Sequence, residues 1–293
     1  MATGAIPYDL LLAAGTGLRA LTLPAGLLVG GGAGAAAILQ RLGIPAATIA
    51  PAACRLARPL VAGLLLAALP LAVVETLLET RAPLDALLFT DLLPYTLANT
   101  LFGVVWAAHL LVLAILALRL RAGHAPGLLG SSALLAAWPQ LTHLLPNFAI
   151  AWPETWVELG AIAAHRVGAA CWLGSLAVLL LWSRPGGPAA RPWGRAFARL
   201  ALPGAALLLA GASSTILTHG GAAALTGPSL FAHLVQIKIG LLAALLLLGA
   251  GHFRRYRHPL VAPTRGTLLV EIGTALAAVL LGALLGVLPS PGS

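Results

Sequence analysis

Long runs of hydrophobic residues alternate with short segments rich in proline and arginine along almost the whole chain. A helix needs roughly 20 mainly apolar residues to cross a bilayer. Eight runs meet this requirement, and proline or glycine separates each of them from the next. The runs are 10–39, 59–80, 95–119, 127–147, 157–182, 198–218, 229–251 and 266–288. The pattern predicts an all-α fold, a polytopic membrane helix bundle with eight transmembrane helices, forming one membrane domain over residues 1–293.

Composition supports this prediction and narrows the class of partner. Hydrophobic residues make up 60% of the chain and charged residues only 9%, which is far from the composition of a soluble domain. The net charge of +9 could indicate nucleic acid, but the basic residues lie in short loops between apolar runs. We therefore expect the lipid bilayer as the partner and no nucleic acid.

The loop charges predict an orientation. Arginines gather in every second loop, and most acidic residues lie in the alternate loops, with Arg81 as the basic exception. Arginine-rich short loops remain in the cytoplasm. Both termini are then periplasmic, and the expected location is a bacterial inner membrane. The arginines concerned are Arg41, Arg55, Arg58, Arg119, Arg121, Arg184, Arg191, Arg195, Arg199, Arg254, Arg255, Arg257 and Arg265.

Small residues indicate close helix contacts. Gly26, Gly30 and Gly34 repeat at four-residue spacing in the first predicted span, and Gly282 and Gly286 do so in the last. This spacing lets two helix backbones approach each other closely. We expect these glycines to serve packing.

Histidines in the apolar runs are the candidate chemistry. With the predicted orientation, His143, His165 and His233 lie at similar depth near the outer face. Ionisable side chains within a membrane usually line a cavity or hold a ligand. We predict a metal site at these three residues, with His109 nearer to mid-membrane as a second-shell or gating residue.

The fifth predicted span carries the sharpest pattern. Glu158, His165 and Trp172 are spaced at seven residues and therefore share a helix face, with Arg166 in the same outer layer. One interpretation is a ligating histidine oriented by an acid and shielded by an aromatic ring. The other is a buried histidine hydrogen-bonded within the bundle. His252, near the basic loops, is expected to be solvated.

Two further charged residues lie within predicted spans. Lys238 is the only lysine of the chain, and Glu271 lies in the last span. A charge in hydrocarbon is expected to have a partner. We interpret Lys238 and Glu271 as a structural or gating pair rather than as metal ligands.

Catalytic motifs are missing from the sequence. There is no HExxH motif, no nucleophile motif and no phosphate-binding loop followed by lysine. We do not expect an enzyme. Imidazole suits copper, zinc, iron and nickel alike, so the histidines alone do not select a metal.

An ordered set of residues in the second half resembles the copper resistance D family, the CopD/PcoD-type integral membrane proteins. The set begins with His165-Arg-Val-Gly-Ala-Ala-Cys-Trp172-Leu-Gly174 and Arg195-Ala-Phe-Ala-Arg199-Leu-Ala-Leu-Pro203. It continues with the span containing Lys238, then Arg254-Arg255 and Pro259, and Glu271 with Pro289. The resemblance makes 126–293 the CopD-like core spans and leaves 1–125 as looser N-terminal spans.

The resemblance implies a function and a partner. Members of this family move copper across the inner membrane, usually with a periplasmic copper-binding protein of the CopC type. By position, His143 and His165 match the family's recurrent histidines. The expected cofactor is a copper ion, taken from the periplasmic side through an outward-facing histidine site.

Two alternatives remain open. Histidines on facing helices also permit a b-type haem with bis-histidine ligation. A docking scaffold for a periplasmic partner, without a permanently bound metal, is the other. The direction of transport, the coupling ion and the oligomeric state are not predicted.

Overall fold

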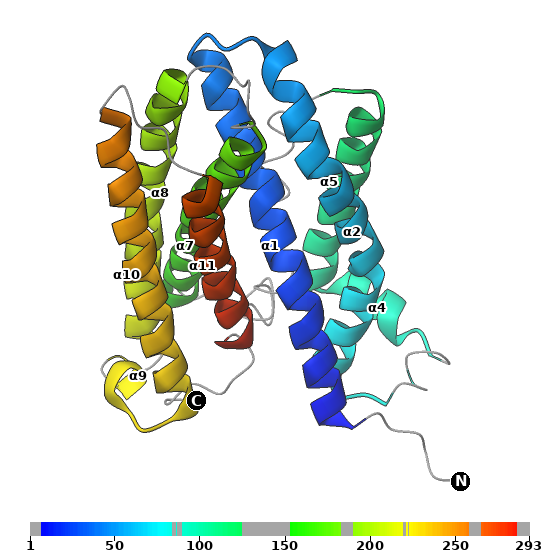
Figure 1. Ribbon diagram of the computed structural model, residues 1–293. Helices are drawn as coiled ribbons and strands as arrows, with labels where there is room; N and C mark the ends of the chain where they lie inside the picture. The colour runs from blue at the N-terminus through cyan, green and yellow to red at the C-terminus, as the bar shows by residue number, and fades with distance from the viewer. Residues whose placement is uncertain are drawn as a thin grey trace.

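The computed structural model describes residues 7–83, 86, 90–124, 153–182, 190–218, 221, 223–257 and 265–285. Within these residues every regular element is a helix, and the fold is an all-α bundle (Figure 1). The helices are α1 (Tyr8–Arg41), α2 (Ala46–Thr80), α4 (Leu92–Asn99), α5 (Leu101–Arg121), α7 (Pro153–Trp182), α8 (Ala190–Thr218), α9 (Ala223–Thr226), α10 (Leu230–Arg257) and α11 (Arg265–Leu285).

Six helices in the described part of the chain are long and apolar enough to cross a membrane. They belong to α1, α2, α5, α7, α10 and α11. The apolar stretch of α8, Arg199–Ser214, is shorter. These helices correspond to seven of the eight predicted spans, and the predicted span 127–147 lies outside the described residues. The chain is a multi-pass membrane protein.

Two predicted boundaries are wrong. Helix α2 begins at Ala46, not at residue 59, because Pro51 and Pro59 are accommodated inside the helix. Proline is tolerated within membrane helices because other groups can satisfy the carbonyls that it frees. The predicted span 95–119 is broken at Thr100, whose backbone is extended and whose side chain accepts a hydrogen bond from the Gly103 amide. That cap ends α4 and starts α5.

Helix α1 lies at the centre of the bundle. It packs against α2, α7 and α11, and one buried apolar cluster contains residues of α1, α2, α7, α8, α10 and α11. A β-carbon on Gly31 would lie 1.7 Å from the Ala170 carbonyl oxygen, and one on Gly174 would lie 2.2 Å from the Gly31 carbonyl carbon. The backbones of α1 and α7 therefore touch at Gly31 and Gly174. Gly34, in contrast, has nothing within 4 Å of such a β-carbon.

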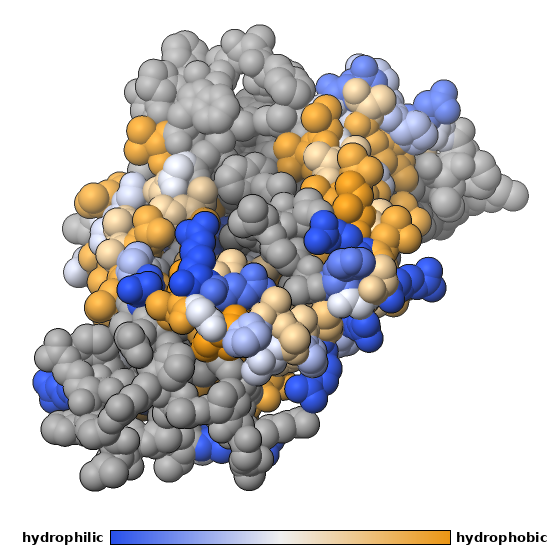
Figure 2. Space-filling view, turned by 90° about the horizontal axis from the view of Figure 1, so that it is seen from above, coloured by the Kyte–Doolittle hydropathy of each residue, from blue (hydrophilic) through white to orange (hydrophobic). Residues whose placement is uncertain are grey.

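The two ends of the bundle differ in charge. The last residues of α1, α5 and α10 and the first residues of α2 and α8 lie toward the upper end in Figure 1, and α11 begins lower, in front of the other helices. We call the upper end the arginine-rich end, because Arg41, Arg119, Arg121 and Arg254 belong to these helix ends. The other end is called the opposite end, and α1 begins there with Asp9 in its first turn. Figure 2 looks onto the arginine-rich end, where hydrophilic residues gather across the described middle of the face and apolar residues flank them.

Candidate functional site

His165 is held by the contact between α7 and α8. A β-carbon on Gly211 of α8 would lie 2.6 Å from the His165 amide nitrogen, so the two backbones meet there. The Nδ1 atom of His165 lies 3.0 Å from the Leu208 carbonyl oxygen. A carbonyl oxygen can only accept, so Nδ1 carries the hydrogen. In the neutral ring Nε2 then has a free lone pair, which is the arrangement of many metal-binding histidines.

The surroundings of His165 are positively charged. Arg166 and Lys238 lie close enough to act on His165 electrostatically, and Arg166 is within similar range of Arg19. These side chains come from α1, α7 and α10. The positive charges of Arg166 and Lys238 disfavour a metal cation placed close to them.

Arg19 and Glu75 form an ion pair between α1 and α2. Arg19 Nε lies 2.7 Å from Glu75 Oε1, and a terminal guanidinium nitrogen lies 2.6 Å from Oε2. The Glu75 side chain is 1% exposed and that of Arg19 15%. The fork of Arg19 matches the carboxylate with two hydrogen bonds, which is the strong geometry for such a pair. This arginine is therefore neutralised within the bundle.

His233 is placed on the exposed side of α10. Its Nδ1 lies 2.8 Å from the Ser229 carbonyl oxygen, one turn earlier in the chain. Five residues separate His233 from Lys238, which corresponds to about 140° around a helix. Lys238 lies toward α11, because a β-carbon on Gly282 would be 3.0 Å from its Nζ. The described structure does not bring His233 and His165 together at one site.

His109 is buried on α5, which packs mainly against α2 and α4. Among the residues that the structure describes, its Nδ1 has no hydrogen-bond partner. Three residues earlier, the Trp106 indole donates to the Ala68 carbonyl of α2 at 3.0 Å. His109 thus belongs to the α2–α5 interface and not to the α7–α8 contact that holds His165.

Trp172, His252 and Glu271 meet where α7, α10 and α11 join, and we call them the buried triad. The Trp172 indole donates to Glu271 Oε1 at 2.8 Å. Glu271 Oε2 lies 3.4 Å from His252 Nδ1. Glu271 is 0% exposed and His252 2%. A β-carbon on Gly249 would lie 2.7 Å from the Trp172 ring, so this glycine makes room for the indole.

The triad corrects two predictions. His252 is buried, not solvated, because it lies on the same face of α10 as Leu245, seven residues earlier. Glu271 does not pair with Lys238. Its partners are Trp172 and His252, whereas the Lys238 amine lies beside Gly282. Eleven residues separate Glu271 from Gly282, about 16 Å along α11.

The remaining predicted site residues lie outside the described part of the chain. They are His143 and the side chain of Glu158, whose backbone belongs to α7. Within the described residues, no three histidine, cysteine, aspartate or glutamate side chains form a group able to hold a metal ion. Of the three predicted ligands, His165 and His233 lie within the described residues and His143 does not.

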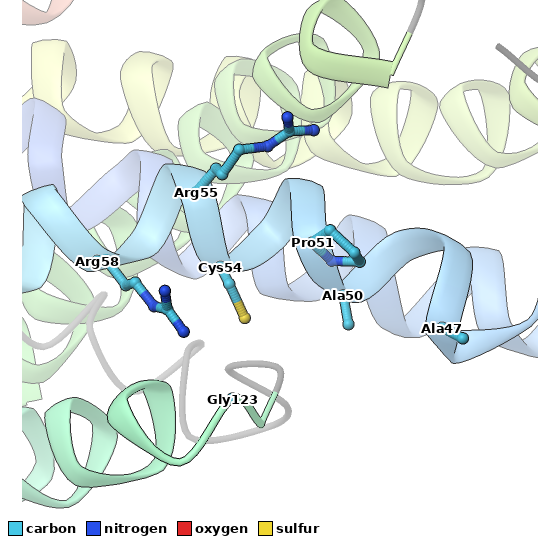
Figure 3. A pocket seen from close by; sticks show the side chains of 7 residues that line it. All are labelled: Ala47, Ala50, Pro51, Cys54, Arg55, Arg58 and Gly123. Atoms are coloured by element: carbon cyan, nitrogen blue, oxygen red, sulfur yellow. The ribbon is translucent and has the colours of Figure 1, made fainter.

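A pocket of about 390 Å³ lies elsewhere, between α2 and the turn after α5 (Figure 3). Arg58 donates to the Leu120 carbonyl at 2.9 and 3.2 Å, and Cys54 Sγ lies 3.5 Å from the His124 carbonyl oxygen. In Figure 3 Arg58 points toward the Gly123 turn, and Arg55 points the other way. The pocket contains none of the predicted site residues.

Comparison of this chain with family models, with curated proteins and with solved structures gave no match.

Proposed function

We propose that this protein is an inner-membrane copper-handling transporter that takes copper from the periplasmic side through a histidine site containing His165. The observation that carries the proposal is the hydrogen bond between His165 Nδ1 and the Leu208 carbonyl. It fixes the ring and leaves Nε2 available as a ligand. Copper, rather than another metal, is taken from the resemblance to the copper resistance D family, as is a CopC-type partner.

The orientation is part of the proposal. Arginine at cytoplasmic helix ends is the common arrangement, so the arginine-rich end is proposed to face the cytoplasm and both termini the periplasm. His165 is 12 residues from the first residue of α7 and 17 from the last. These separations correspond to about 18 and about 26 Å along a helix. His165 then lies nearer to the periplasmic face.

Few of the described residues take part in the proposed copper site. His165 supplies one imidazole nitrogen, and His143 is the expected second ligand. Copper is held at Nε2 of His165, because the hydrogen bond to the Leu208 carbonyl occupies Nδ1. His233 is not a ligand in this arrangement, because it lies on the exposed side of α10.

Copper binding by purified protein in nanodiscs tests the proposal. The parent is expected to bind copper, and His165→Asn is expected to lose it. Asparagine can still donate to the Leu208 carbonyl but has no Nε2. His233→Ala is the matched control and should bind as the parent does. Equal binding by the parent and His165→Asn would overturn the proposal, and a Soret band in the parent would replace copper with haem b.

A further inference from the structure

Glu271 is an acidic side chain enclosed in apolar surroundings. It is 0% exposed, and its neighbours Leu268 and Ala275 on α11 belong to the same buried cluster as Trp172 of α7 and Leu245 of α10. An isolated carboxylate in such surroundings is costly, and the usual solution is to take up a proton or to pair with a cation. The neighbours of Glu271 determine whether it takes up a proton or pairs with a cation.

Among the described residues, the lysine and arginine side chains lie away from Glu271. Among the side chains of α10 that the structure describes, His252 faces Glu271, whereas Lys238 is 14 residues earlier than His252 and Arg254 is exposed. From α7, the facing group is the Trp172 indole, whereas Cys171 packs against Gly204 of α8. On α1, Arg19 is paired with Glu75 and Arg41 is exposed, and on α11 itself Arg265 is exposed. No permanent cation neutralises Glu271 in this part of the chain.

We infer that Glu271 and His252 together form a proton-binding site. The indole N–H donates to Oε1, so Oε1 acts as the carbonyl oxygen of the acid. The exchangeable proton then lies on Oε2, which is 3.4 Å from His252 Nδ1, close to this atom but not in hydrogen-bond geometry with it in this arrangement. A neutral imidazole with its hydrogen on Nε2 can accept that proton at Nδ1. The loaded pair is neutral overall, and loss of one proton to water leaves a single negative charge on the pair.

A metal ion does not fit this position. The Trp172 hydrogen occupies the Oε1 side of the carboxyl group, and a cation is not tolerated next to an N–H donor. On the Oε2 side the only described group within reach is one imidazole. The residues of the triad therefore offer room for a proton rather than for a coordinated ion.

The site links protonation to helix packing. Its three members come from α7, α10 and α11, and the Trp172 ring rests on Gly249 of α10. Removing the proton leaves a charge in a dry contact, which is relieved when the three helices separate and admit water. Glu271 is six residues from the first residue of α11, about 9 Å along the helix, and lies in the half of α11 nearer to the arginine-rich end. Water from that end is the expected proton donor and acceptor, so the site is suited to a coupling proton whether or not the protein handles copper.

Infrared difference spectroscopy of the full chain in nanodiscs tests this inference. At neutral pH the parent should show the carbonyl stretch of a protonated carboxylic acid. The band should be missing in Glu271→Gln and present in Glu75→Gln, because Glu75 is bound by Arg19 and ionised. In Trp172→Phe the band should move to higher frequency, since its carbonyl oxygen loses a hydrogen bond. This shift separates the proposed geometry from a general loss of structure.

Two outcomes would overturn the inference. A parent spectrum without a carboxylic acid band that depends on Glu271, at any pH at which the protein is folded, would show a permanently ionised side chain. A band that does not shift after long exposure to heavy water would show a proton that never exchanges. Loss of the band as the pH is raised, with recovery when it is lowered, is the expected result. None of these readings depends on copper, so they are independent of the test at His165.

Discussion

The site at His165 and the buried triad are built on the same helix, yet they treat polar atoms in different ways. Seven residues of α7, about 10 Å along a helix, separate His165 from Trp172. At His165 the backbone of α8 satisfies one ring nitrogen and leaves the other available. In the triad the polar atoms face each other within a buried, apolar contact. The first arrangement can receive a ligand from outside the bundle, whereas the second can hold little more than a proton.

Both sites lie on α7, but different neighbouring helices hold them, so a mutation can affect one site without the other. The α7–α8 backbone contact at Gly211 holds His165, and the room that Gly249 leaves on α10 holds Trp172. A change at one of these contacts should damage one site and leave the other. A change at the α1–α7 contact, which positions the whole of α7, should damage both sites.

The largest effect is expected for Gly31→Ala. The new β-carbon would overlap the Ala170 carbonyl at 1.7 Å, and α7 can avoid it only by moving away from α1. Overpacking at a rigid backbone contact costs about 3 kcal/mol or more. We expect a strongly lowered thermal unfolding temperature, with loss of both copper binding and the infrared band. Gly34→Ala is the matched control, since it meets nothing within 4 Å, and an equal loss there would contradict the assigned contact.

The next largest effect is expected at the ion pair near the opposite end. Glu75→Gln leaves Arg19 without its charged partner, and removing one partner of a buried pair typically costs about 3 kcal/mol. The double variant Arg19→Met with Glu75→Met should recover much of that loss, because two apolar side chains can replace a buried pair. Thermal unfolding of the single and double variants measures this. A double variant that is less stable than Glu75→Gln would argue against the pair as described.

A smaller and more local effect is expected for Gly249→Ala. Its methyl group would push the Trp172 ring away from Glu271, at a cost of about 1–2 kcal/mol. The infrared band of Glu271 should shift as it does in Trp172→Phe, and copper binding should be unchanged. Gly251→Ala places a methyl group in open space and should leave the band where it is. A loss of copper binding in Gly249→Ala would mean that the two sites are not independent.

The smallest effect is expected for His233→Ala. The side chain is exposed and bonded only to the carbonyl of its own preceding turn, so its removal should change stability by less than about 0.5 kcal/mol. Copper affinity measured by titration should equal that of the parent. A drop of tenfold or more would restore His233 to the metal site.

Hydropathy was sufficient to predict the seven spans that lie within the described residues, because it depends on local composition, whereas the orientation drawn from loop charge stays a prediction. The break at Thr100 and the early start of α2 escaped prediction, since each depends on one cap or on prolines that neighbouring helices accommodate. The glycine repeat indicated close packing in the first span, but Gly31, outside the repeat, makes the contact with α7. Packing partners in space, not spacing along the chain, decide which glycine is used.

The candidate sites were predictable to different degrees. The spacing of His165 and Trp172 placed both residues on one face of α7, but it could not show that one residue contacts α8 and the other α10 and α11. His252 was wrongly predicted to be solvated, although Lys238, Leu245 and His252 repeat at seven residues in the same way. Proximity to a basic loop suggested solvent, whereas helix phase determined burial. Partners from distant helices, such as Trp172 for Glu271, leave no local pattern in a single sequence.

The copper-binding isotherm of purified protein, measured side by side for His165→Asn and Glu271→Gln, tests the distinction between the two sites most directly. The site at His165 should bind the metal, and the buried triad should hold only a proton. We predict that His165→Asn loses copper binding and that Glu271→Gln binds copper with the affinity of the parent. Retained binding in His165→Asn, or an equal loss in both variants, would contradict this account.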